Sequence, residues 1–255
     1  MQRNERCVTD MLLRDKVAVV YGASGPVGGA AARAFAREGA RVFLAGREKA
    51  RLDKDAGLAA TGETASVDAH DEEAVNAYVD GIVARTGRLD ISFNATGYGD
   101  VQQPLTEIAL EDFLQPIANA MRTQFLTTRA AARHMAERRS GVVLAFGGGG
   151  TQTLPGLGGF KIALDALEGL RRQWACELGA QGIRVVTLKS GGVPEGIPAD
   201  FPGRAEIEAE LVGTTLLGRP ATLEDVGDVA AFVASDHART LTSTDVNISC
   251  GAIVD

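Results

Sequence analysis

Short runs of apolar and β-branched residues alternate along the chain with longer stretches of helical periodicity. Most of the runs are apolar on both faces, as is typical of strands buried between two layers of helices. The predicted strands span residues 17–22, 41–46, 64–69, 89–95, 141–147, 183–189 and 245–249. The predicted helices span residues 28–39, 71–87, 111–138, 161–180 and 222–235. Because a repeated order of strand and helix requires right-handed crossovers, we predict a doubly wound parallel sheet of seven strands in a three-layer α/β/α fold.

The length of 255 residues, without a shift in composition, indicates one large α/β domain, which we place at residues 14–255. Residues 1–13 begin with the polar stretch MQRNERCVTD and are predicted to be a flexible extension. One long interruption follows the sixth predicted strand, where residues 191–220 hold four of the eight prolines. Such a segment at the end of a strand is a candidate for a mobile lid over a cleft.

Charge and composition narrow the range of partners. The net charge of −7 argues against a general nucleic-acid binder, because that affinity rests mainly on Lys and Arg neutralising phosphates. The sequence contains neither an apolar run of the ~18 residues that cross a membrane nor the apolar middle of a secretory signal. We therefore expect a cytoplasmic protein without a membrane partner. The three cysteines and three histidines have no disulfide or metal-ligand spacing, so no metal site is predicted.

A glycine-rich turn, YGASGPVGG at residues 21–29, joins the first predicted strand to the first predicted helix. Bare main chain and the free N–H groups of a helix N-terminus suit a phosphate, as in a Rossmann-type dinucleotide site. The alternative is a tight structural turn. Pro26 suits the first turn of a helix but removes one N–H from the phosphate contacts. The predicted contacts are Gly22, Ser24, Gly25, Val27 and Gly28.

The turn resembles the T-G-x-x-x-G-x-G motif of the short-chain dehydrogenase/reductase family, with Tyr21 in place of threonine and Pro26 in place of the middle glycine. Further similar segments follow in the family's order, over about residues 14–252. They are Asp68 after the third strand, NATG at 94–97, KIALDAL at 161–167, GIRVVTLKSGG at 182–192 and GRPATLEDVGDVAAFVASD at 218–236. The resemblance implies a nicotinamide dinucleotide cofactor. It places Asp68 and Ala69 at the adenine, Asn94 and Gly97 along the middle of the cofactor, and Lys161 at the nicotinamide ribose.

The end of the second strand bears on the choice of cofactor. An acidic residue there would bind the ribose 2′-hydroxyl and repel a 2′-phosphate, but the strand ends at Gly46 and Arg47 follows. A guanidinium suits phosphate, so we favour NADP over NAD. Two alternatives stay open: Arg47 is a solvated residue at a helix start, or Glu48 binds the hydroxyl instead.

Residues that the family uses for proton chemistry are missing. Members carry a Tyr-x-x-x-Lys segment, a serine after the fifth strand and an asparagine in the preceding long helix. Alignment on KIALDAL places Lys161 at the lysine position of this motif and Leu157 at the tyrosine position. Lys161 is therefore the one catalytic candidate. The serine falls in the run GGGG at 147–150, and the asparagine falls on Ala120, since Asn119 would face about 100° away. Tyr98, Thr151 and Thr153 are weaker candidates for a replacement acid.

Three functions fit these residues. The first is an NADP(H)-dependent oxidoreductase with atypical catalytic residues, acting on a small carbonyl or alcohol or on a carrier-bound acyl group. The second is a cofactor-binding but redox-inactive relative, and the third is an isomerase or cyclase on the same fold. Family members often form dimers or tetramers, so the resemblance also implies a homo-oligomer.

Overall fold

The computed structural model describes residues 11–148, 153–201 and 203–254. Within these ranges seven parallel strands form one sheet in the order β3-β2-β1-β4-β5-β6-β7, which confirms the predicted doubly wound topology. The strands are β1 (Val17–Tyr21), β2 (Arg41–Gly46), β3 (Gly62–Ser66), β4 (Ile91–Asn94), β5 (Gly141–Phe146), β6 (Ile183–Lys189) and β7 (Thr244–Asn247).

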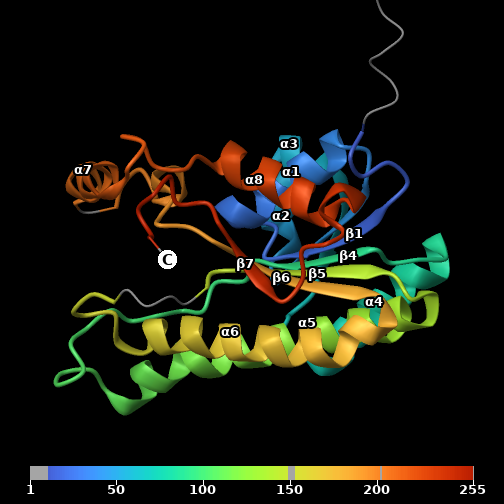
Figure 1. Cartoon of the computed structure of the whole chain (residues 1–255), viewed down its shortest axis with the longest axis horizontal. Coiled ribbons are helices and arrows are strands. Elements are labelled where there is room, and N and C mark those ends of the chain that lie inside the picture. The colour runs from blue at the N-terminus through green and yellow to red at the C-terminus, as the bar shows by residue number, and fades with distance from the viewer. Residues whose placement is uncertain (1–10, 149–152, 202, 255) are drawn as a thin grey trace, which may run out of the picture.

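Helices cover both faces of the sheet (Figure 1). One layer contains α1 and α8, and the opposite layer contains α4, α5 and α6. The α-helices are α1 (Pro26–Arg37), α2 (Lys49–Lys54), α3 (Ala56–Ala59), α4 (Glu72–Thr86), α5 (Leu110–Arg138), α6 (Gly158–Leu178), α7 (Arg204–Thr214) and α8 (Leu223–Ala234). Short 3-10 helices are η1 (Gly179–Gln181), η2 (Pro194–Gly196) and η3 (Asp236–Ala238). None of the helices in the described ranges is long and apolar enough to cross a bilayer.

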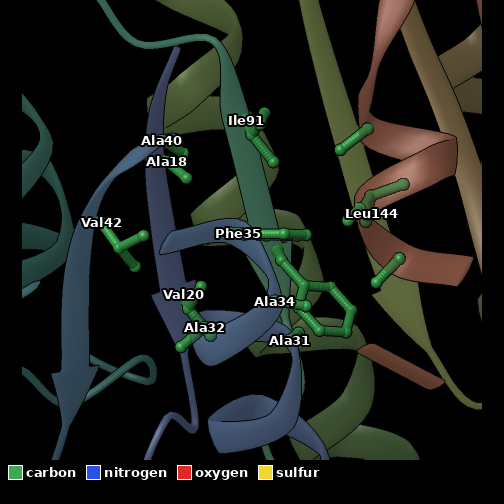
Figure 2. Packing of buried hydrophobic residues seen from close by; sticks show 14 of the residues in the cluster. Ala18, Val20, Ala31, Ala32, Ala34, Phe35, Ala40, Val42, Ile91 and Leu144 are labelled. Carbon is green, nitrogen blue, oxygen red and sulfur yellow. The ribbon is translucent and has the colours of Figure 1, made fainter. Parts of the chain in front are cut away.

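The five inner strands are mostly apolar because both of their faces are buried, whereas the edge strands β3 and β7 are more polar and only partly buried. On one face, Phe35 and the alanines of α1 point at β1 and β4, where Val20 and Ile91 meet them (Figure 2). The Phe35 ring lies 6.3 Å from that of Phe93 in a tilted arrangement. Small alanine side chains let α1 approach the sheet closely, which brings the start of this helix next to the end of β1.

The predicted extension and lid differ in part from the structure. Leu13 falls inside the predicted flexible segment, yet it is fully buried in the core, and its N–H donates to the Glu38 carbonyl. Residues 1–10 lie outside the described residues. The predicted lid contains η2 and α7, and α7 lies at the side where the strands end (Figure 1). No residue of α7 within the described part of the chain is buried, and the mobility of the segment stays a prediction.

A buried carboxylate ties β1 and β4 to α5. Asp90 is 4% exposed, and its Oδ2 accepts hydrogen bonds from the Val17 N–H at 2.8 Å and from Arg88 Nε at 2.7 Å. Arg138 Nη1 donates to its Oδ1 at 3.2 Å. Burial acts to raise the pKa of Asp90, but the hydrogen bonds from Arg88 and Val17 and the Arg88 charge outweigh it, so the pKa lies below its ordinary value.

Replacing Asp90 with asparagine is expected to lower the free energy of unfolding near neutral pH by about 1.5–3 kcal/mol, because charged hydrogen bonds are lost. Since the folded pKa is depressed, the ionised carboxylate stabilises the fold above its ordinary pKa of about 3.9, and this stability is lost as pH falls through the lower folded value. Urea unfolding between about pH 2 and pH 7 measures both effects. A wild-type pH dependence that persists unchanged in the variant would contradict this role.

Candidate functional site

A polar cavity of about 460 Å³ opens at the carboxyl ends of the strands on one side of the sheet. This is the edge at which doubly wound sheets bind ligands. The turns after β1, β2, β3 and β4 form most of it, and α5 contributes Gln115 and Asn119. Its lining is Tyr21, Gly22, Ser24, Gly25, Ala45, Gly46, Arg47, Val67, Asp68, Ala69, His70, Thr96, Gly97, Gly99, Gln115 and Asn119. We call this cavity the groove.

The predicted binding residues divide into two groups. Six of them line the groove, namely Gly22, Ser24, Gly25, Arg47, Asp68 and Gly97. The other four, which are Val27, Gly28, Asn94 and Lys161, are not among its lining residues. Residues far apart in the sequence therefore meet here because they follow the ends of four parallel strands, β1 to β4.

Two glycines shape the corner between β1 and α1. Gly22 has φ +71°, and a Cβ on it would lie 2.6 Å from the Ala95 carbonyl oxygen. A Cβ on Gly28 would lie 2.3 Å from the Gly22 carbonyl oxygen. Pro26 starts α1. Gly28 thus allows the helix to approach the turn, while Gly22 and Gly25 expose main chain to the groove.

Gly28→Ala is expected to lower the free energy of unfolding by about 1–3 kcal/mol, because the added methyl overlaps backbone that has to shift. Urea unfolding monitored by circular dichroism measures the change. Gly81→Ala is the matched control, since nothing lies within 4 Å of a Cβ at that position in α4, and it should leave stability unchanged or raise it. Equal effects of the two substitutions would show that the corner tolerates a side chain.

Asn94 and Val27 do not line the groove and lie behind its walls. The Asn94 side chain is buried, its Nδ2 donates to Thr127 Oγ1 at 3.0 Å, and its Oδ1 accepts from the Thr96 N–H at 3.0 Å. Asn94 therefore fixes the turn that brings Thr96 and Gly97 to the groove. Val27 is partly buried and packs against the core on the α1 side of the sheet.

One end of the groove carries charge. Asp68 Oδ1 accepts from the His70 N–H at 3.0 Å and lies 2.9 Å from His70 Nδ1. The backbone hydrogen bond from His70, opposed by burial and helped by the His70 ring and the Arg47 charge, holds the pKa of Asp68 below its usual value. Glu48 lies 3.8 Å from Arg51 and does not line the groove. His70 was not among the predicted site residues, although its position shortly after the third predicted strand is a signal for the groove.

The first turns of α6 face the end of β5 with apolar side chains. Leu164 Cδ2 lies 3.1 Å from the point that a Cβ on Gly147 would occupy, and the Tyr98 hydroxyl lies 3.5 Å from that point. The Phe160 ring is 6.3 Å from the Tyr98 ring. Phe160 and Leu164, which are four residues apart, pack against a cluster that contains Tyr98, Ala120 and Ala163. We call Tyr98, Phe160 and Leu164 the apolar centre.

The pair chosen by alignment lies elsewhere on α6. Leu157 precedes the helix as its N-cap, and Lys161 Nζ lies 2.5 and 2.6 Å from the two carboxylate oxygens of Asp165. Leu157 and Lys161 lie three residues before Phe160 and Leu164, which is less than one helical turn, so sequence similarity alone distinguishes the two pairs poorly. Only the packing of the helix shows which residues meet Gly147.

The other catalytic candidates have structural partners or lie outside the described residues. Tyr98 is 6% exposed, its hydroxyl donates to the Phe146 carbonyl at 2.9 Å, and burial raises its pKa above the ordinary value. Asn119, expected to face away, lines the groove and donates Nδ2 to the Tyr98 carbonyl at 2.9 Å. Thr153 is exposed, and Thr151 and the glycines at 149 and 150 lie outside the described residues. Within the described chain no cluster of His, Cys, Asp or Glu could hold a metal ion.

Comparison with known proteins agrees with this arrangement. A family model described as "Enoyl-(Acyl carrier protein) reductase" matches residues 22–252. An uncharacterized oxidoreductase of Methylorubrum extorquens is 34% identical over 249 residues, which cover 94% of this chain and 98% of that protein. Secoisolariciresinol dehydrogenase of Forsythia intermedia is 30% identical over 253 residues, which cover 94% of this chain and 89% of that protein.

The similarity extends to solved structures. The crystal structure of levodione reductase matches with a TM-score of 0.85 and 26% identity, and the match covers 94% of this chain and 98% of that one. The glycine corner, the strand order and the family match over residues 22–252 agree along nearly the whole chain. The chain therefore belongs to the short-chain dehydrogenase/reductase family.

Proposed function

We propose that this chain is an NADP(H)-dependent oxidoreductase that acts on an alcohol or carbonyl substrate with atypical catalytic residues. The observation that supports it most is the groove, in which bare main chain after β1 and the Arg47 guanidinium after β2 border one cavity. The bound nicotinamide would supply hydride transfer. Similar proteins named secoisolariciresinol dehydrogenase and levodione reductase are consistent with an oxidation or reduction reaction.

The residues present fit this cofactor. Gly22, Ser24 and Gly25 offer main chain for the pyrophosphate, and a Cβ on Gly22 would collide with the Ala95 carbonyl beside them. Arg47 would bind the 2′-phosphate, because β2 ends at Gly46 without an acid and Glu48 lies beside Arg51. Asp68, ionised and next to His70, would bind the adenine amino group.

The remaining predicted residues have supporting roles in this proposal. Gly28 allows the close approach of α1, Val27 offers its N–H at the helix start, and Asn94 holds the Gly97 turn against the middle of the cofactor. Lys161 could reach a ribose only if its ion pair with Asp165 opens. We therefore assign it less weight than the groove residues.

The apolar centre is the atypical part of the proposal. Phe160 and Leu164 occupy the positions over Gly147 at which we place the family's tyrosine and lysine. Glycine at 148 and alanine at 120 replace its serine and asparagine. A positioned acid or base contributes about 10²–10⁴ in rate, so we expect carbonyl reduction to be slow unless the substrate itself supplies the proton.

The same centre favours a second candidate function, a cofactor-binding protein without redox activity. Fluorescence titration with NADPH tests the groove, and NADPH oxidation over a panel of ketones, aldehydes and acyl thioesters tests the chemistry. Binding with turnover supports the first function, and binding without turnover on the whole panel supports the second. A chain that binds neither NADPH nor NADH would overturn both.

A further inference from the structure

Buried polar side chains gather between α6 and β6, away from the groove. Glu168 and Arg171 are each 7% exposed. Glu168 Oε2 accepts from Arg171 Nε at 2.8 Å and lies 2.7 Å from Arg171 Nη2. Thr187 on β6 is fully buried beneath them. A buried ion pair stabilises a fold only when its remaining donors and acceptors also find partners.

Several atoms of this cluster lack such a partner. Arg171 Nη1, Trp174 Nε1, Thr187 Oγ1 and Glu168 Oε1 are shielded from solvent and have no hydrogen bond within the described chain. Buried polar groups in folded proteins are almost always paired, with protein or with ordered water. Three of these atoms, Arg171 Nη1, Trp174 Nε1 and Thr187 Oγ1, belong to residues that line one cavity, which indicates a common partner for them.

The cluster borders a small cavity. A space of about 20 Å³ is lined by Arg171, Trp174 and Thr187 together with residues of α5 and β5. One water needs roughly 10–15 Å³ and two to four polar partners. A molecule larger than one water does not fit in a space of this size.

Hydrogen-bond chemistry selects the occupant. Arg171 Nη1 and the Trp174 indole can only donate, so the occupant has to accept two hydrogen bonds. The Thr187 hydroxyl can accept one in return. Glu168 already offsets the charge of Arg171, so no anion is required. We propose that a single structural water binds here, accepting from Arg171 and Trp174 and donating to Thr187.

The cluster lies next to Gly148, after the end of β5. A Cβ on Gly148 would lie 3.0 Å from Thr187 Cγ2 and 3.1 Å from Glu168 Oε1. The Thr187 methyl and the Glu168 carboxylate therefore both lie against Gly148. This polar cluster fills the space beneath the position where the family carries its serine, so a side chain at 148 would disturb the bound water.

The test uses the single tryptophan of the chain, whose indole N–H gives one resonance in a ¹H–¹⁵N spectrum. A cross-peak from this proton to water, with the sign of a water resident for longer than nanoseconds, is the expected result. Thr187→Val should weaken that cross-peak several-fold and shift the indole resonance. Thr187→Ser, which keeps the hydroxyl, should restore it. Thr106→Val, at an exposed position before α5, is the matched control.

Absence of the water cross-peak in the folded wild-type protein would overturn the proposal, as would a cross-peak that Thr187→Val leaves unchanged. A crystal structure provides the second measurement and does not depend on how the variants fold. A density peak of water size within hydrogen-bond distance of Arg171 Nη1 and Trp174 Nε1 is expected. A chloride at the same place, or a collapsed cavity, would refute it.

Discussion

The double variant Phe160→Tyr/Leu164→Lys is expected to reduce a small ketone about 10²–10⁴ times faster than the wild-type chain at saturating NADPH. The expectation rests on the apolar centre, where these two side chains lie beside Tyr98 and Gly147. Tyrosine would supply the missing acid, and lysine four residues later would lower its pKa. Gly148 is left unchanged, because a Cβ there would crowd Thr187 and Glu168.

Leu157→Tyr is the matched control for this prediction. With the native Lys161 it creates the same Tyr-x-x-x-Lys spacing, but at the N-cap and next to the Lys161–Asp165 ion pair. We expect no gain in rate from it. Steady-state NADPH oxidation measures both proteins, and circular dichroism establishes that both are folded. A gain from Leu157→Tyr without one from the double variant would show that the active pair was assigned to the wrong face of α6.

Arg47→Ala is expected to weaken NADPH binding about 10–100-fold while leaving NADH binding nearly unchanged. A charged hydrogen bond contributes about 1.5–3 kcal/mol, and each 1.36 kcal/mol corresponds to a factor of ten. Arg47 lies on the groove and near Asp68, so its guanidinium is the cation placed to meet a 2′-phosphate. Fluorescence titration with each dinucleotide gives the two dissociation constants.

Arg51→Ala controls for a general loss of positive charge in the same region. Arg51 lies on α2, pairs with Glu48 and does not line the groove, so its loss should change neither constant by more than about twofold. If the wild-type chain binds NADH more tightly than NADPH, or if Arg47→Ala weakens both equally, the choice of NADP is wrong.

The groove was largely predictable because its residues follow strand ends that can be read from local pattern. Gly22, Ser24, Gly25, Arg47, Asp68 and Gly97 were all predicted and all line one cavity. The positions of His70 and Asn119 were not anticipated. His70 owes its place to a hydrogen bond with Asp68, and Asn119 owes its place to the way α5 crosses the sheet.

The helix beside the candidate centre was predicted less well. Residues 161–180 were expected to be helical, and α6 begins at Gly158 instead. Alignment on KIALDAL selected Lys161; in the structure its amino group pairs with Asp165, while Leu164 contacts the Gly147 region. The glycine-rich segment before the helix has no hydrophobic periodicity from which the start of the helix could be predicted.

The sequence by itself determined the order of the seven strands and of five helices, the family and the glycine corner, because these depend on periodicity and on residues close together in the chain. The helices α2, α3 and α7 were not predicted. The tertiary structure alone decided which face of α6 meets β5, and that Arg171, Trp174 and Thr187 line one small cavity. These features depend on helix rotation and on contacts across the sheet. Successive residues of an α-helix are rotated by about 100° around its axis, so an alignment error of a few residues assigns the motif to a different face of the helix.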